Sequence, residues 1–344
     1  MRFLILLAAL LTSARAASAC SAFMLHGTEG PIVAKSYDWH QEHGLVLINK
    51  KDVRKRALVL SAKDKAATWT STHASVTFNQ YGAELPNGGM NDAGLVVEVL
   101  MLPSSEFARA DDRSVVTEAG FVQYLLDQAA SLDEALALAD DVRVAPAYAK
   151  IHYFVCDVDS KCASLEFIAG RLVATTGEAM PVCAITNSTY AQSKASLAET
   201  AASMSSLGRF NRIAQQLTTS PNNATPASAW ALLDKVSFDT STQWQVVYEP
   251  SARRVAFRTL KHRSKKSVSL AAFKPGCADP VMMQDMASDA EGDISADFVA
   301  YSEDKNRALV QATYGAVRKV LPKGMEQVVV TLPRSQSCTV PFSR

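Results

Sequence analysis

Short apolar segments, rich in β-branched residues and broken by glycine turns, follow the first nineteen residues of the chain. The segments 20–27, 30–39 and 44–51 predict strands that form a sheet at once. Residues 88–102 predict a turn that leads into a further apolar strand. The first third of the chain is therefore expected to be mainly β-structure.

The apolar spacing changes to a helical period over residues 117–130 and 131–142. Ser131 and Glu134 form a capping-box pattern at the start of the second helix. Further expected elements are strands in 151–167, 170–177 and 181–187, helices at about 195–217 and 226–236, and a hairpin over 244–260. This order predicts an α+β fold, a four-layer αββα sandwich in which two antiparallel sheets stack between helical layers.

No linker rich in Pro, Gly or Ser and no internal repeat divides the chain. A single domain over residues 20–344 is therefore the simplest expectation, with a less readable C-terminal tail from about residue 275.

The first residues have the pattern of an export signal. An apolar run from Phe3 to Leu11 leads to Ala17-Ser18-Ala19, the small-x-small pattern that a signal peptidase accepts. The run is shorter than the roughly 20 residues that a membrane-spanning helix needs. We therefore expect residues 1–19 to be removed. The mature protein would begin at Cys20 and be periplasmic or secreted, with no stable membrane insertion.

Charge gives no indication of a polyanionic partner. The chain has 35 basic and 34 acidic residues, a net charge of +1. The one short basic run, residues 261–266, is typical of a solvated turn. Nucleic acid is therefore not expected as a partner.

Six cysteines lie at or beyond the expected cleavage site. Such residues usually pair in an oxidising compartment. Cys156 and Cys162 bracket a turn-like insert between two strand patterns, so we expect a bridge across a hairpin. Cys277 and Cys338 would tie the late segment to the tail, and Cys183 would stay free in a strand. No CxxC pair or histidine pair supports a metal site, and no cofactor is expected.

Cys20 is the candidate nucleophile. After cleavage this residue would carry both a thiol and a free α-amine, and the ordinary pKa of such an amine is about 7.7 to 8.0. Such an amine can take the proton of the thiol and later deliver it to a leaving amine. A disulfide or lipidation are the alternatives. However, Ala17 stands where a lipobox normally has Leu, and lipidation would acylate the amine that catalysis requires.

The segment from Cys20 to Trp39 resembles the start of the choloylglycine hydrolase family, N-terminal-nucleophile (Ntn) hydrolases that include bile salt hydrolases and penicillin V acylases. The segments "GGMNDAGLVV", "AITNSTY" and "LGRFNRI" resemble later family motifs in the same order. Trp39 directly after an aspartate is similar to the exported Gram-negative type. The resemblance implies an Ntn-hydrolase fold and hydrolysis of linear amide C–N bonds.

The resemblance also implies roles for single residues. Asp38 matches the aspartate that holds and orients the α-amine. Asn187 matches an asparagine of the oxyanion hole, and Arg209 matches the arginine that braces the site. Lys35 stands where the family commonly has arginine, so a planar donor is replaced by a point charge, although a cation still favours the thiolate.

Three further residues bear on the substrate. Trp39 would line the acyl pocket or pack in the core. Met101 stands where bile salt hydrolases have a second asparagine, so this half of the oxyanion hole would come from a backbone N–H, that of Leu100 or a neighbour. The resemblance thus implies a small-molecule N-acyl amide substrate, such as penicillin V, an N-acyl homoserine lactone or an acyl amino acid. Conjugated bile acids are less favoured.

Several alternatives stay open at this point. Cys20 could carry a lipid on a non-catalytic surface lipoprotein, or Lys35 and Met101 could mark an inactive family member. A thioester intercepted by an amine would make the enzyme an acyltransferase. The short stretch between Asn187 and Arg209 lacks the extension that locks the tetramers of cytoplasmic Gram-positive members, so a homo-oligomer would have to use another face.

Overall fold

The computed structural model describes residues 19–198, 203–219, 222–315 and 323–339. The expected signal peptide, apart from Ala19, lies outside these residues.

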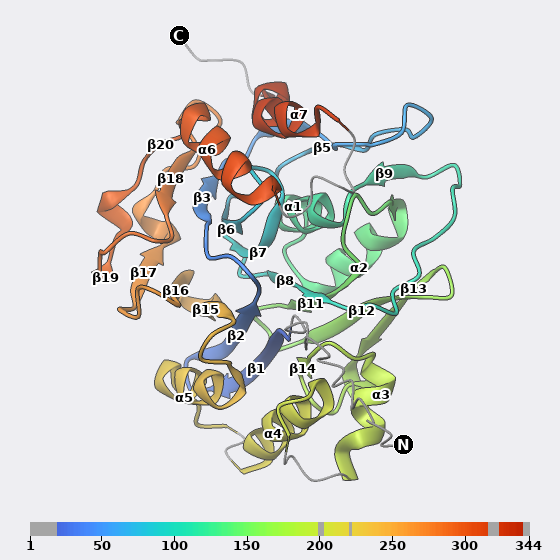
Figure 1. Ribbon diagram of the computed structural model, residues 1–344, viewed down its shortest axis with the longest axis vertical. Coiled ribbons are helices and arrows are strands. Elements are labelled where there is room, and N and C mark those ends of the chain that lie inside the picture. Colours follow the sequence, from blue (N-terminus) through green and yellow to red (C-terminus); the bar gives the residue numbers. More distant parts are fainter. Residues whose placement is uncertain (1–18, 199–202, 220–221, 316–322, 340–344) are drawn as a thin grey trace, which may run out of the picture.

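Two stacked sheets form the centre of the molecule (Figure 1). The seven-stranded sheet has the order β14 (Ala184–Ile185), β1 (Ser21–Gly27), β2 (Gly30–Asp38), β15 (Thr242–Glu249), β16 (Arg254–Thr259), β17 (Lys266–Ser269) and β19 (Gly292–Asp293). The nine-stranded sheet has the order β13 (Arg171–Thr176), β12 (Cys162–Ile168), β11 (Ile151–Cys156), β8 (Val96–Met101), β7 (Pro86–Asn91), β6 (Ser75–Asn79), β3 (Leu45–Asn49), β18 (Met282–Asp285) and β20 (Val299–Ala300). Neighbouring strands are antiparallel except β17 and β19.

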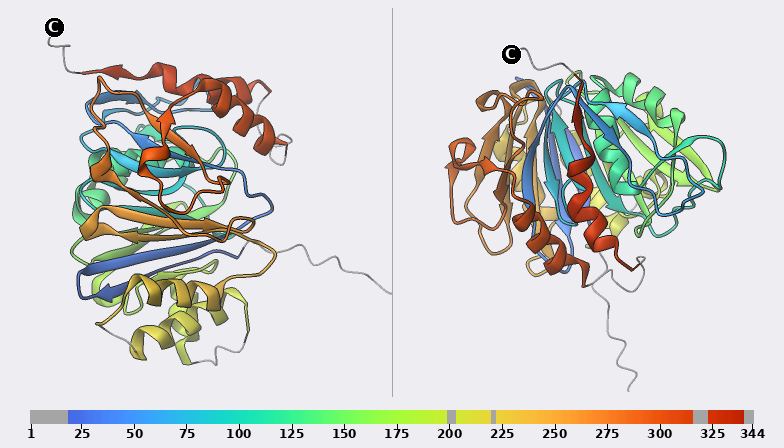
Figure 2. Two further views of the ribbon diagram at one scale, coloured as in Figure 1. Left: turned by 90° about the vertical axis from the view of Figure 1, so that its left-hand side faces the viewer. Right: turned by 90° about the horizontal axis from the view of Figure 1, so that it is seen from above.

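Helices cover the outer faces of both sheets. On the seven-stranded sheet, α4 (Ser206–Thr219) contacts β1 and β14, and α5 (Pro226–Val236) contacts β2 and β15. On the nine-stranded sheet, α1 (Glu118–Gln128) contacts β7 and β8, with α2 (Leu132–Asp141) beside it. Figure 2 shows α4 and α5 in yellow on the outer side of the blue strands β1 and β2. The four-layer αββα prediction is confirmed.

The remaining elements complete the periphery. They are β4 (Val53–Arg56), β5 (Thr68–Thr70) and β21 (Ser337–Cys338) in a small sheet, the parallel pair β9 (Ser114–Val116) and β10 (Val142–Val144), and the helices α3 (Tyr190–Ala195), α6 (Glu303–Tyr314) and α7 (Met325–Thr331). Among the described residues, no helix is long and apolar enough to cross a membrane.

Local sequence explains where the central elements begin. The side chain of Thr117 accepts from the N–H of Gly120, and that of Ser131 accepts from the N–H of Glu134, so both expected helices are capped. The strands β1 and β2 are buried along almost their whole length, because helices cover one face and the other sheet covers the second.

Two expectations about elements are wrong. The early strands do not form one sheet: β1 and β2 pair with each other, whereas β3 belongs to the other sheet. The helix expected at about 195–217 is interrupted, because α3 ends at Ala195, a 3-10 turn follows over Ser196–Ala198, and α4 begins only at Ser206. The apolar spacing is helical on both sides of this break, so the sequence pattern does not show where the helix is interrupted.

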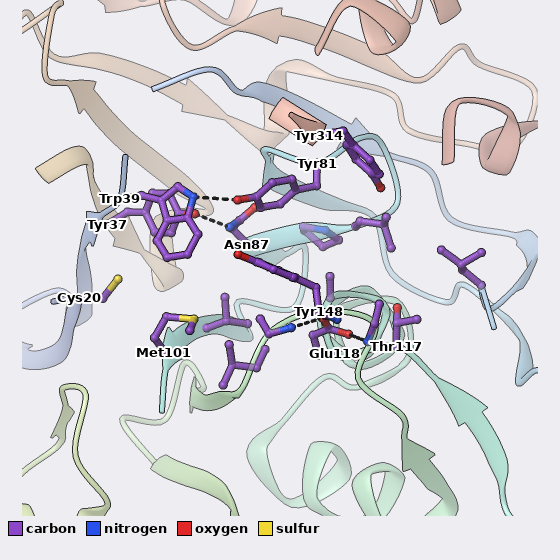
Figure 3. A pocket seen from close by; sticks show the side chains of 18 of the residues that line it. Cys20, Tyr37, Trp39, Tyr81, Asn87, Met101, Thr117, Glu118, Tyr148 and Tyr314 are labelled. Atoms are coloured by element: carbon purple, nitrogen blue, oxygen red, sulfur yellow. Dashed lines mark hydrogen bonds between the residues drawn. The ribbon is translucent and has the colours of Figure 1, made fainter. Parts of the chain in front are cut away.

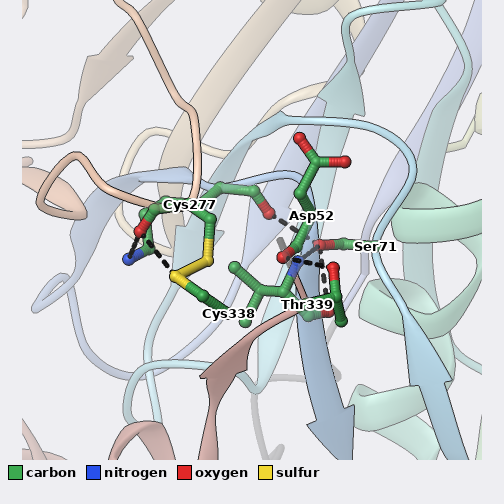
Figure 4. The surroundings of a disulfide bond; sticks show 7 residues. Asp52, Ser71, Cys277, Cys338 and Thr339 are labelled. Carbon is green, nitrogen blue, oxygen red and sulfur yellow. Dashed lines mark hydrogen bonds between the residues drawn. A yellow bond between two sulfur atoms is a disulfide. The ribbon is translucent and has the colours of Figure 1, made fainter. Parts of the chain in front are cut away.

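The tail after residue 275 is built into both sheets. It supplies β18 and β20 to one sheet and β19 to the other, and then forms α6 and α7. Both expected disulfides are present, Cys156–Cys162 across the β11–β12 hairpin and Cys277–Cys338 between the tail segments. Around the second disulfide, Thr339 bonds the carbonyl oxygen of Asp52 next to β4 (Figure 4). Cys183 is free, as expected, but it directly precedes β14 instead of lying within a strand.

Candidate active site

Cys20 directly precedes β1 and lies at one end of a cavity between the sheets (Figure 3). Cys20 is only 1% exposed, and its Sγ lies 3.9 Å from the carbonyl oxygen of Asp38. Burial, and secondarily the negative charge of Asp38, raise the pKa of this thiol to about 11 in the chain described, in which Cys20 is still joined to Ala19. In this state the thiol is protonated near neutral pH.

Asp38 ends β2, the strand that pairs with β1. The hydroxyl of Thr242 donates a short hydrogen bond to its Oδ1. Its Oδ2 is buried and has no hydrogen-bond partner among the described residues. Burial raises the pKa of this carboxyl to about 6, against the opposing effects of Thr242 and the nearby cations. The site thus contains a buried acceptor with one unused oxygen.

Arg209 joins Cys20 to Asn187. It lies in the first turn of α4 and is 1% exposed. One guanidinium nitrogen donates to the carbonyl oxygen of Cys20 at 2.6 Å and to the hydroxyl of Ser21 at 2.5 Å. The other donates to Oδ1 of Asn187 at 2.9 Å. Burial lowers the pKa of Arg209, while the charges of Asp38 and Cys20 oppose that shift.

The amide of Asn187 is oriented from both sides. Its Oδ1 accepts from Arg209, so its Nδ2 is the donor end, and this nitrogen donates to the carbonyl oxygen of Met101 at 2.8 Å. Nδ2 carries two hydrogens, and the Met101 carbonyl needs only one. The predicted donor therefore has a fixed orientation beside a cavity-lining residue.

A buried histidine that the sequence analysis missed supports this segment. His152 of β11 donates from Nε2 to the carbonyl oxygen of Thr186, directly before Asn187, at 2.7 Å. Its Nδ1 lies 3.3 Å from Glu166, which also accepts from the backbone N–H of Tyr190 at 2.8 Å. His152 and Glu166 are isolated polar residues within apolar strand patterns, and this was the available signal for a buried polar pair.

Lys35 does not line the cavity. Its ammonium forms a buried ion pair with Glu98 of β8 at 2.5 Å and donates to the carbonyl oxygen of Asn87 at 3.0 Å. The hydroxyl of Tyr248 donates to the other oxygen of Glu98 at 2.5 Å. The charge of Lys35 lowers the pKa of the Cys20 thiol, but less than burial and Asp38 raise it. Lys35 therefore acts on the Cys20 thiol through its charge and not through a direct contact at the cavity.

The cavity is lined mainly by aromatic and aliphatic side chains (Figure 3). Trp39 and Met101 both line it beside Cys20. The indole N–H of Trp39 donates to the hydroxyl of Tyr81 at 2.7 Å. The Leu100 side chain points away, into the buried core that it shares with Cys20, because successive strand residues face opposite sides. A role for Leu100 would thus be limited to its backbone.

The one charged side chain among the described lining residues is already engaged. Glu118 accepts the backbone N–H groups of Ala147, Tyr148 and Ala149 at 2.6 to 2.8 Å. It therefore fixes residues 147–149, which form part of the wall, instead of presenting a free charge to a ligand.

The chain resembles known proteins in sequence and in fold. The family model of acyl-coenzyme A:6-aminopenicillanic acid acyl-transferase matches residues 26–260. Penicillin V acylase from Agrobacterium tumefaciens has a similar structure, with a TM-score of 0.72 and 20% identity over 82% of this chain and 98% of that one. A mutant of conjugated bile acid hydrolase from Clostridium perfringens has a TM-score of 0.65 and 12% identity over 82% of this chain and 96% of that one. The comparison with curated protein sequences found no relative.

Proposed function

Because the chain belongs to the acyl-coenzyme A:6-aminopenicillanic acid acyl-transferase family, a family of acyl-transferases and amide hydrolases, we propose that it hydrolyses N-acyl amides. Cys20 is the nucleophile in this proposal, and removal of residues 1–19 activates it. The same proposal places the protein in the periplasm or outside the cell.

The unpartnered Oδ2 of Asp38 is the observation that carries the proposal. A buried carboxylate oxygen normally has a hydrogen-bond partner, and leaving it without one costs free energy. Cleavage between Ala19 and Cys20 would create an α-amine next to the strand end that carries Asp38, and the protonated form of this amine could donate a hydrogen bond to the free Oδ2. The amine would also oppose the charge that, together with burial, keeps the thiol pKa at about 11.

The reaction then follows from the positions of the groups. The α-amine, in its neutral form, takes the proton of Cys20 and becomes the ammonium that Asp38 holds, and the sulfur attacks the amide carbonyl carbon. The C–N bond breaks, the leaving nitrogen receives the proton from the α-amine, and a thioester remains. Water, deprotonated by the same amine, attacks the thioester carbon. The C–S bond breaks, the proton passes from the amine to the sulfur of Cys20, and a carboxylic acid is released. Nδ2 of Asn187 stabilises the oxyanion, with a backbone N–H near Met101 as the second donor.

The lining of the cavity indicates the substrate class. Apolar and aromatic side chains surround it, and among the described lining residues no cation is present. An uncharged apolar acyl group therefore fits this wall, which supports penicillin V, N-acyl homoserine lactones and acyl amino acids over substrates with an anionic acyl end.

Burial of Cys20 favours hydrolysis over a lipid-anchored binding protein. A diacylglyceryl group on Sγ would have to leave the protein interior, but Cys20 is 1% exposed and packs in the core between the sheets. Arg209 and Asn187 are also oriented around it.

Intact mass and turnover of the exported protein test the proposal together. We expect a chain that begins at Cys20 with an unmodified amine, and that releases the acid from penicillin V or an N-acyl homoserine lactone. The Cys20→Ala variant should release none. Added diacylglyceryl mass on Cys20, or equal turnover by Cys20→Ala, would refute the proposed nucleophile.

A second variant pair tests the oxyanion donor. Asn187→Ala should lower kcat by about 10²- to 10³-fold with a smaller change in KM, because the lost interaction strengthens only as the oxyanion forms. Ser188→Ala, which removes only a hydroxyl bonded to Ser206, is the matched control and should stay within a few-fold of the parent. A similar loss of kcat in both variants would mean that catalysis depends on the conformation of the loop and not on the side-chain amide of Asn187.

A further inference from the structure

The C-terminal helices form part of the cavity wall away from the nucleophile. Two of their residues line the same cavity as Cys20: Tyr314, the last residue of α6, and Met325, the first residue of α7. Figure 3 shows Cys20 and Tyr314 on opposite sides of this cavity. Both wall residues lie beyond residue 260, where the match to the family model ends. This part of the wall thus belongs to a segment that the family pattern does not describe.

The two helices are packed closely against the segment between β6 and β7. Gly82 has a φ of +116°, and a Cβ at this position would come within 2.4 Å of Val329 in α7. The buried side chain of Asn306 in α6 accepts from the backbone N–H of Ala83 at 2.9 Å. A satellite core of Leu85, Val310, Tyr314, Met325, Val329 and Val330 fills the contact. The wall is therefore held in a defined place.

An aromatic row connects this wall to the residues beside the nucleophile. Trp39 donates to the hydroxyl of Tyr81, and the ring of Tyr81 meets the ring of Tyr314 edge to face at 6.3 Å. With its amide carbon at Cys20, an acyl chain would extend along this row. It would end against Tyr314 and Met325.

We infer that the helices α6 and α7 set the length of the acyl chain that the site accepts, with Tyr314 as the main stop. This inference rests on the proposed function for the position of the amide, but not on which leaving amine is used. Each methylene that the cavity can bury should raise kcat/KM by about fourfold. Beyond the stop, each further methylene should lower it.

Substitutions of Tyr314 in opposite directions test the inference. The mature enzyme is assayed with a series of N-acyl homoserine lactones whose linear acyl chain grows by two carbons at each step. Tyr314→Ala should move the optimum of kcat/KM to longer chains, and Tyr314→Trp should move it to shorter ones. The matched control is Leu309→Ala: this buried α6 residue packs in a different cluster and does not line the cavity. It should leave the optimum unchanged.

Binding without turnover separates this inference from the proposed function. In the Cys20→Ala protein, the affinity for free fatty acids of increasing length is followed by tryptophan fluorescence, with thermal melting as the check that each variant is folded. If the optimal fatty-acid length shifts in the Tyr314 variants, the inference is supported even if no amide is hydrolysed. An unmoved optimum in both folded Tyr314 variants, or an equal shift in Leu309→Ala, would overturn it.

Discussion

At the scale of single residues, Asp38 shows a conflict between stability and function. The carboxyl is fully buried, one oxygen is bonded by Thr242, and the other has no partner among the described residues. Its pKa of about 6, against an ordinary 3.8, means that folding favours the protonated form. Between these two pH values the folded state binds more protons than the unfolded state, so stability falls as pH rises. The ionised group that the proposed reaction needs is therefore costly in the uncut chain.

Replacing this carboxyl by an amide should stabilise the uncut chain at high pH. The variant is Asp38→Asn in the chain in which Cys20 is still joined to Ala19. The change that it causes in the free energy of unfolding should be more stabilising at pH 8 than at pH 4. The expected difference is about 2.5 kcal/mol, from a shift of about two pKa units that is already partly expressed at pH 4. Urea unfolding at both pH values gives this difference, and the mature variant should be inactive.

The exposed Asp239 provides the control for that comparison. Asp239→Asn should change the unfolding free energy by no more than about 0.5 kcal/mol at either pH. If Asp38→Asn destabilised the uncut chain at pH 8, burial would not be the dominant influence on this carboxyl, and the activating role of cleavage would lose its basis.

The neighbours of Cys20 could be predicted because each lies in a short segment that resembles a family motif. Asp38, Asn187 and Arg209 follow this pattern, and the structure brings Arg209 to both Cys20 and Asn187. Glu98 could not be found in this way. Its partner Lys35 lies 63 residues earlier and in the other sheet, and no local pattern links two strands that meet only through stacking.

At the scale of elements, one buried ion pair connects the two sheets near the site. Lys35 of β2 meets Glu98 of β8, and both residues are at most 2% exposed. Gly88 of β7 lies opposite Glu98, and a Cβ there would come within 2.0 Å of its carboxylate. The absence of a side chain at Gly88 thus leaves the space that the carboxylate needs. Burial raises the pKa of Glu98, and Lys35 opposes this shift.

Breaking this pair from one side should be more harmful than removing it entirely. Lys35→Met leaves a buried carboxylate, and Glu98→Leu leaves a buried ammonium; each should cost about 3–5 kcal/mol of unfolding free energy. The Lys35→Met/Glu98→Leu double variant should recover most of that loss, and a double-mutant cycle by chemical denaturation measures it. Additive losses would show that the pair is not coupled.

The same double variant gives a catalytic readout. Without the charge of Lys35, the thiol pKa should rise, because this charge lowers it in the parent chain. The alkaline shift should appear in the pH dependence of kcat/KM even when stability is restored. An unchanged profile would restrict Lys35 to a structural role.

Elements were predictable where apolar spacing and caps agreed, and not where they depended on distant packing. Ser131 caps its helix as expected, but the carboxylate of Glu134 accepts from the N–H of Ala130 instead of that of Ser131. The sequence around β3 indicated a strand, yet its place in the second sheet is decided by its pairing with β6. The alternation of residues in a strand shows which of its faces is buried, but it does not show which sheet the strand joins.

At the scale of the whole molecule, the two disulfides constrain different things. Cys156–Cys162 spans 6 residues within one hairpin, whereas Cys277–Cys338 spans 61 residues that include α6 and α7. At the far end of this loop, β21 pairs with β4. The longer bridge therefore ties the helices of the cavity wall to the rest of the fold.

Loop length predicts unequal consequences of removing the two bridges. In the chain-entropy model, closing 61 residues contributes about 4 kcal/mol and closing 6 residues about 2 kcal/mol. Cys277→Ser/Cys338→Ser should therefore lower the urea midpoint more than Cys156→Ser/Cys162→Ser. Only the first variant should also broaden the acyl-length optimum, because it alone loosens the segment that holds Tyr314. Equal midpoints together with a broadened optimum in the hairpin variant would contradict both parts, since the hairpin bridge lies outside the loop that Cys277–Cys338 closes.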